Sequence, residues 1–242
     1  VCSSDLTRVE AVRRDDGRLT VSGSRRGSPV MHSADLVLVV VGVRPNTDLL
    51  TDAGAATGAG GAVVVDERMR TGLPNVWAAG DGVVTHHRLL GVTYLPLGTT
   101  SHKQGRVAGE NAVGGDALFA GSLGTQVVKV FDLVAARTGL RDVEASAAGY
   151  QPLSHTTVVD DHKRYYPGAT PITIRVTGDD RDGRLLGAQL VGARGAEISK
   201  RVDTYATALH HGMSVAAMSE LDLSYSPPLG SPWDAVQMPT QA

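Results

Sequence analysis

The chain has 242 residues, a formal net charge of −2 and 42% hydrophobic residues. This length allows one large or two ordinary domains, and the near-neutral charge gives no reason to expect a nucleic-acid partner. No stretch approaches the roughly 18 apolar residues of a transmembrane helix, so no membrane partner is expected either.

Cys2 is the only cysteine, which excludes a disulfide within the chain. Without a disulfide framework or the basic, apolar start of an export signal, we expect a cytoplasmic protein. The sequence begins at Val1 instead of Met, so we expect it to be the later part of a longer chain.

The first third of the sequence predicts mainly β structure. Leu6–Val21 alternates around Asp15-Asp16-Gly17 and predicts a hairpin, whereas Ser22–Ser33 is polar and predicts a loop. Leu36–Val43 (LVLVVVGV) is a continuous β-branched run, which is typical of a buried parallel strand. Asp48–Ala53 predicts one helical turn before Gly54, and Ala62–Val65 predicts another short strand.

The most informative stretch is Thr71–Val83 (TGLPNVWAAGDGV). Val76–Ala79 predicts a short buried strand, and Asp81 follows at its carboxyl end between Gly80 and Gly82. Ligands bind at that end of strands in open α/β sheets, and flanking glycines allow a close backbone approach. The alternative interpretation is that Asp81 only caps the next turn.

Thr99–Val113 predicts a helix that Thr99, Thr100 or Ser101 can cap. Its first turn offers free N–H groups and a partial positive charge, which suit an anion or an electron-rich ring edge. Lys103 and Arg106 add charge or are simply solvated. The neighbouring pair His86-His87 points in opposite directions on a regular element, so no metal site is predicted.

The second half predicts an antiparallel sheet followed by helices. The expected strands are Gln126–Phe131, Gln151–Val159, Pro171–Thr177 and Arg184–Val191. Glu197–His211 is the clearest helix, because Ile198, Val202, Tyr205, Ala206 and Leu209 share one face. Ser214 is expected to cap a second short helix, and the proline-rich tail is expected to be irregular.

Six blocks in this order resemble the flavin-dependent pyridine nucleotide–disulfide oxidoreductases, and in particular the coenzyme A-disulfide reductase and NADH oxidase branch. They are Leu36–Leu50, Val65–Val83, Leu97–Asn111, Gly124–Leu140, Tyr165–Thr170 and Asp222–Trp233. The resemblance implies an α/β remnant of FAD- and NAD(P)-binding Rossmann-like domains, followed by an α+β dimerisation domain with an antiparallel sheet. The implied limits are 1–48 for the end of the NAD(P)H-binding domain, 49–123 for the second FAD segment and 124–242 for the dimerisation domain.

The resemblance also implies cofactors, FAD with NADH or NADPH, and a set of residues that contact FAD. Asp81 would accept hydrogen bonds from the ribityl hydroxyls, and the helix after Leu97 would face the pyrimidine edge of the flavin. The implied contact residues are Gly80, Asp81, Gly82, Leu97, Thr99 and Thr100. The Gly-rich dinucleotide loops and the redox cysteine of the family are expected upstream of this chain.

Catalytic and substrate-binding roles are likewise implied by the resemblance. Tyr166 and Tyr225 would reach the active site of the partner subunit in a homodimer formed through 124–242, unless these tyrosines only pack at the dimer interface. His102, Tyr165 and Trp233 would contact a small thiol or disulfide. Trp233 stands where relatives that use coenzyme A often have Lys. Leu229 replaces an aromatic residue, and the His–Pro and Glu of the glutathione reductase branch are absent from the tail.

The function implied is reduction of a disulfide, such as coenzyme A disulfide or a polysulfide, at the expense of NAD(P)H. One alternative is an NADH oxidase that reduces oxygen. The other is that this chain by itself is a non-catalytic dimerisation module.

Overall fold

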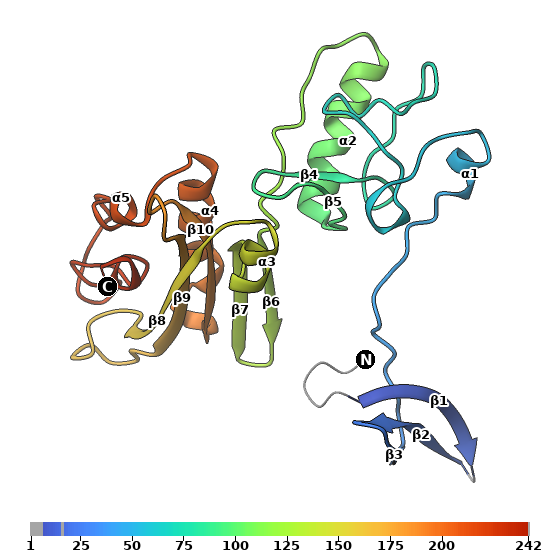
Figure 1. Cartoon of the computed structure of the whole chain (residues 1–242). Helices are drawn as coiled ribbons and strands as arrows, with labels where there is room; N and C mark the ends of the chain where they lie inside the picture. The colour runs from blue at the N-terminus through green and yellow to red at the C-terminus, as the bar shows by residue number, and fades with distance from the viewer. Residues whose placement is uncertain (1–6, 16, 242) are drawn as a thin grey trace. The chain divides into compact units, whose positions relative to one another are not determined.

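The structure is a computed structural model that describes residues 7–15 and 17–241, so Cys2, Leu6 and Asp16 lie outside the described residues. The chain forms two compact units, which divide between Arg44 and Pro45. Each unit is described by itself (Figure 1). Among the described residues, no helix is both long and apolar enough to cross a bilayer.

The first unit is a three-stranded antiparallel sheet of β1 (Thr7–Asp15), β2 (Arg18–Arg25) and β3 (Ser28–Ala34), in that order. The expected hairpin is confirmed. The prediction of a loop at Ser22–Ser33 is wrong, because most of these residues belong to β2 and β3. Arg26 and Gly27 have φ values of +51° and +85°, which suits a tight two-residue hairpin turn. The polar residues on either side pair as strands, although they show no apolar alternation.

The apolar run Leu36–Val43 is not the buried strand that its sequence predicts. It has no regular secondary structure, and its large exposed side chains are 68–82% accessible. A strand that is buried on both faces needs neighbouring strands and covering helices. None of the described residues pairs with this run.

The second unit begins with short elements around one long helix. These are α1 (Asp48–Thr51), the 3₁₀ turn η1 (Ala59–Gly61), the hairpin β4 (Thr85–His87) and β5 (Gly91–Thr93), and α2 (Gly98–Ala112). The strands expected at Ala62–Val65 and Val76–Ala79 are reduced to isolated bridges. Val63 pairs with Val83, and Trp77 pairs with Arg70.

The remainder of this unit is built on a five-stranded antiparallel sheet in the order β6-β7-β10-β9-β8. Its strands are β6 (Gln126–Val130), β7 (Leu133–Gly139), β8 (Pro152–Asp160), β9 (Pro171–Asp179) and β10 (Leu185–Ala193). The four strands expected from the sequence are confirmed, and β7 is an additional one. The antiparallel sheet predicted for the second half of the chain is therefore present.

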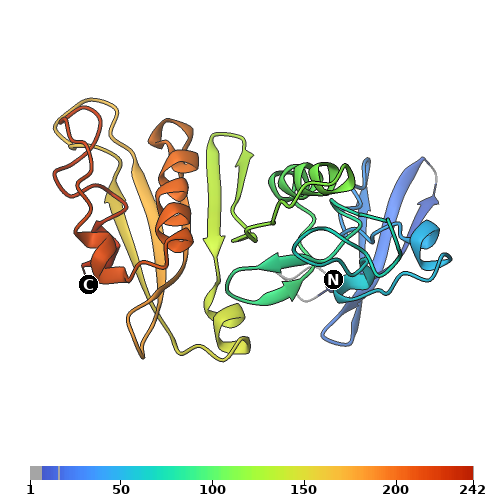
Figure 2. The same cartoon turned by 90° about the horizontal axis from the view of Figure 1, so that it is seen from above.

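Three helices and two 3₁₀ turns follow in the described part of the unit: α3 (Asp142–Ala147), η2 (Arg194–Ala196), α4 (Ile198–His210), α5 (Val215–Ser219) and η3 (Met238–Thr240). The predicted apolar stripe of α4 packs on β7 and β10, and Figure 2 views α4, in orange, alongside the strands from above. Ile198, Val202, Tyr205 and Leu209 are buried there with Ile174 and Leu190. Ser214 caps α5 by accepting from the Ala217 N–H, as expected.

Candidate functional site

Asp81 lies on an exposed turn beside the start of α2. Its Oδ1 accepts a hydrogen bond from Ser101 Oγ at 2.7 Å, and its backbone carbonyl accepts from the Tyr94 hydroxyl at 3.1 Å. Among the described residues, Ser101 supplies the only side-chain hydrogen bond to this carboxylate. The acidic group is therefore oriented by the helix and remains open to solvent, as an acceptor for a ligand must be.

The two glycines beside Asp81 leave space around it. Gly80 has a φ of +90°, a conformation that favours glycine, and a Cβ at Gly80 would meet only Ser101, at 3.8 Å. A Cβ at Gly82 would meet no described atom within 4 Å. The backbone on either side of the carboxylate can thus be approached closely.

The N-terminus of α2 is free of the side-chain caps that the sequence predicts. Leu97 is the N-cap residue and makes no side-chain capping bond among the described residues. Ser101 Oγ bonds Asp81, and buried Thr100 pairs with Ser122 Oγ at 3.1 Å. Because both hydroxyls are engaged elsewhere and Thr99 is exposed, the first-turn N–H groups keep their capacity to bind an electron-rich group.

A buried glutamine, which sequence reasoning missed, attaches α2 to the turn that carries Asp81. Gln104 is fully buried, accepts from the Gly80 N–H at 3.1 Å and donates to the Val84 carbonyl at 3.3 Å. It lies one helical turn from Thr100, so helical periodicity alone could have marked it as buried. His102, between Ser101 and Lys103, is exposed.

A second group of predicted residues gathers where the β8–β9 loop meets the C-terminal tail. The Lys163 N–H donates to the Pro227 carbonyl at 3.2 Å, and the rings of Tyr165 and Tyr166 lie 5.4 Å apart. Desolvation and a hydrogen bond with Tyr225 raise the pKa of Tyr165. This phenol therefore stays protonated at neutral pH and remains a hydrogen-bond donor.

A buried arginine joins the two segments that carry these tyrosines. Arg201 of α4 donates to both carboxylate oxygens of Asp234, at 2.6 and 2.8 Å, beside the exposed Trp233. It also donates to the Asp161 carbonyl, at the start of the β8–β9 loop, at 2.7 Å. Asp161 in turn accepts from the Thr170 N–H, which closes the loop. No described contact joins this group to Asp81.

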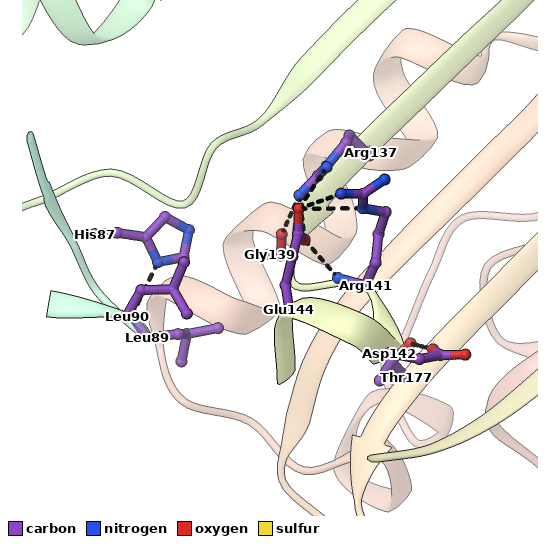
Figure 3. Close-up of polar contacts among 9 residues, drawn as sticks. All are labelled: His87, Leu89, Leu90, Arg137, Gly139, Arg141, Asp142, Glu144 and Thr177. Carbon is purple, nitrogen blue, oxygen red and sulfur yellow. Dashed lines mark hydrogen bonds and ion pairs between the residues drawn. The ribbon is translucent and has the colours of Figure 1, made fainter. Parts of the chain in front are cut away.

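The two neighbouring histidines point apart, as expected. His86 is exposed, whereas His87 is buried, and its Nδ1 accepts from the N–H groups of Leu89 and Leu90 (Figure 3). Burial lowers the pKa of His87. Within residues 7–15 and 17–241, no group of three or more His, Cys, Asp or Glu side chains has a metal-binding arrangement.

We predict that His87 makes the stability of the protein fall as the solution is acidified. The folded-state pKa lies below the unfolded value of about 6.5, so the unfolded chain takes up the proton first. The contribution of neutral His87 to the free energy of unfolding is complete above pH about 6.5. It is lost as the pH falls toward the folded-state pKa of His87. Urea unfolding between pH 7.5 and 5 should show this loss in the wild type. H87N keeps an acceptor for the two N–H groups and should flatten that part of the profile, and an unchanged profile would exclude His87 as its source.

Comparison with known proteins agrees with this geometry. The pyridine nucleotide-disulphide oxidoreductase model matches residues 5–105, and the dimerisation domain model of the same family matches residues 125–235. The chain therefore belongs to the pyridine nucleotide–disulfide oxidoreductases, a family that uses FAD and NAD(P)H. The dimerisation domain supports a homodimer.

Three relatives indicate the branch. An NAD(P)H sulfur oxidoreductase (CoA-dependent) of Pyrococcus furiosus is 35% identical over 92% of this chain and 51% of its own length. A coenzyme A disulfide reductase of Staphylococcus aureus is 30% identical over 84% of this chain and 46% of its own. The solved NAD-dependent persulfide reductase of A. fulgidus has a TM-score of 0.90 and 36% identity, over 97% of this chain and 43% of its own. The chain thus spans about half the length of the curated relatives it matches.

Proposed function

We propose that the full-length protein is an FAD-dependent NAD(P)H oxidoreductase that reduces a small disulfide, such as coenzyme A disulfide or a polysulfide. The observation that carries this proposal is the exposed Asp81 carboxylate, oriented by Ser101 beside an uncapped helix N-terminus. The similarity to disulfide and persulfide reductases supports the same substrate class. We also propose the limits 1–48, 49–123 and 124–242 for the three parts of the chain.

The residues around Asp81 fit a flavin dinucleotide. The carboxylate is a hydrogen-bond acceptor for ribityl hydroxyls, and Gly80 and Gly82 leave room for such a chain. The first turn of α2, with Leu97, Thr99 and Thr100, presents N–H groups that stabilise negative charge on a reduced ring. The chemistry that FAD supplies when bound is hydride acceptance and two-electron reduction.

The tyrosines and their neighbours serve the thiol side of the reaction. Reduction of a disulfide takes two electrons and two protons and releases two thiols. In the proposed homodimer, Tyr166 and Tyr225 donate hydrogen bonds to a departing thiolate in the partner subunit, where negative charge develops. His102, Tyr165 and Trp233 contact the thiol or disulfide substrate. The protonated state of Tyr165 suits this role.

The full-length protein should be yellow when purified, and its NAD(P)H oxidation should depend on added coenzyme A disulfide or polysulfide. Oxygen uptake should be measured in parallel. A colourless dimer would contradict the proposal and favour a dimerisation module. NAD(P)H consumption matched by oxygen uptake would favour an NADH oxidase.

Replacing Tyr225 with phenylalanine should lower kcat for disulfide reduction by roughly 10- to 100-fold, the worth of one hydrogen bond to a charged group. Flavin content should stay unchanged. Y150F is the matched control, because the hydroxyl of Tyr150 bonds only the Leu89 carbonyl among the described residues. Equal kcat values for Y225F and Y150F would show that the Tyr225 hydroxyl has no catalytic role and that Tyr225 only packs at the dimer interface.

A further inference from the structure

A single side chain of α2 holds both ends of the turn that carries Asp81. Gln104 Oε1 accepts from the Gly80 N–H at 3.1 Å, and Gln104 Nε2 donates to the Val84 carbonyl at 3.3 Å. Gly80 directly precedes Asp81, and Val84 lies three residues after it. In the described part of the chain, neither backbone group has another hydrogen-bond partner. One amide therefore fixes the segment 80–84 at its two ends.

Gln104 acts on Asp81 without being accessible to a ligand. Its exposed fraction is 0%, whereas Asp81 is exposed. Ser101, three residues earlier on α2, holds the Asp81 carboxylate at 2.7 Å, and residues spaced by three lie on one helical face. The same face of α2 thus binds the carboxylate through Ser101 and the backbone on both sides of it through Gln104.

The Asp81 turn needs such support because a glycine lies on either side of the acid. Glycine has more backbone freedom than any other residue, and Gly80 is held at a φ of +90°. A binding group has to be kept within about 0.5 Å of its productive position by the contacts behind it. The two hydrogen bonds of Gln104 supply a restraint that the glycines by themselves do not.

We propose that Gln104 is a positioning residue for FAD, which holds the Asp81 turn in a fixed place relative to the N-terminus of α2 before the cofactor binds. This inference rests on the proposed function, because FAD is the ligand that spans both elements. Its ribityl hydroxyls bond the Asp81 carboxylate while its ring faces the first turn of α2. Since one rigidly connected ligand makes both contacts, a displacement of the turn against the helix weakens binding.

A buried amide can also serve only to stabilise the fold, and Asn111 provides the comparison. Asn111 lies on the same helix, is 4% exposed and bonds the Arg68 carbonyl and both backbone groups of Ala117 at 2.8–2.9 Å. In the described part of the chain it makes no hydrogen bond to the segment 80–84. Loss of the Asn111 amide should therefore lower stability without displacing Asp81.

The test is FAD binding by the apoprotein of the full-length Q104M and N111L variants, measured by fluorescence titration together with the melting temperature. Both substitutions replace a buried amide with an apolar side chain of similar size, so both should lower the melting temperature. Q104M should raise the dissociation constant for FAD about tenfold, the worth of one weakened hydrogen bond to a charged group. N111L should keep the wild-type value. In a D81A background Q104M should add less than about twofold, because residues that act through one network are not additive.

The Q104E variant tests the same contact by rescue, and it replaces Q104M if that variant does not fold. A protonated carboxyl accepts from the Gly80 N–H and donates to the Val84 carbonyl, as the amide does, whereas an ionised carboxyl only accepts. Burial favours the protonated form. The affinity of Q104E for FAD, relative to the wild type at the same pH, should therefore improve as the pH is lowered from about 8 to about 6.

Wild-type affinity for FAD in Q104M would overturn the inference, and so would equal losses of affinity in Q104M and N111L. Both results leave the proposed function in place, because the wild type still binds FAD. A wild type that binds no FAD would overturn the proposed function and this inference together. If the wild type binds FAD but shows no disulfide-dependent oxidation of NAD(P)H, only the proposed function fails, and the dissociation constants still decide the role of Gln104.

Discussion

Replacing Asp81 with alanine in the full-length protein is expected to weaken FAD retention by roughly 10- to 100-fold. The loss corresponds to a hydrogen bond from a charged acceptor, about 1.5–3 kcal/mol. Asp81 is exposed, so its removal should hardly change the stability of the apoprotein. The measurement is the flavin content of the purified protein together with the dissociation constant from fluorescence titration.

The geometry around Asp81 offers matched controls. D116A removes an acid that is also exposed and that pairs with Arg68 beyond the opposite end of α2. D81N keeps an oxygen for the Ser101 hydroxyl but loses the charge. Flavin retention should be normal in D116A, intermediate in D81N and weakest in D81A. Equal retention in D81A and D116A would show that Asp81 does not contact the cofactor.

Replacing Arg201 with methionine should destabilise the protein by about 3–5 kcal/mol, because it leaves the largely buried Asp234 carboxylate without its partner. The side chain of Arg201 is only 9% exposed, and it donates to the tail, to the β8–β9 loop and to the Ala196 carbonyl. The melting temperature should fall by at least about 6 °C for a unit of this size. Differential scanning calorimetry gives this value directly.

The neighbouring Lys200 is the control for this substitution. It is 78% exposed and pairs with Asp203 at 3.3 Å, a surface ion pair of the kind worth about 0–1 kcal/mol. The double variant R201M/D234N removes the unpaired charge and should recover part of the loss. If R201M lowers the free energy of unfolding by no more than K200M does, Arg201 does not hold the tail in place.

The sequence predicted elements well where a periodic pattern coincides with local chemistry. The stripe of α4 and the Ser214 cap of α5 follow from helical spacing and N-cap preference, and both are present. The alternation of Pro171–Thr177 identified β9 in the same way. α3 was missed, because six residues give too little periodicity to detect.

Other predictions failed where the outcome depends on distant partners. Leu36–Val43 has the composition of a buried strand, yet none of the described residues pairs with it. The hydroxyls expected to cap α2 bond Asp81 and Ser122 instead, across about 20 residues of sequence. Whether a segment pairs as a strand, and which group a hydroxyl bonds, depends on tertiary contacts that cannot be predicted from a local sequence pattern.

The sequence by itself determined the family, the antiparallel sheet of the second half and the acidic residue between two glycines, because motif order and periodicity are local properties. Only the tertiary structure decided that Ser101 and Gln104 hold the turn of Asp81 against α2. It also decided that Arg201 joins the tail to the tyrosine loop. These features join residues far apart in the chain, since burial and strand register are set only when the whole domain packs.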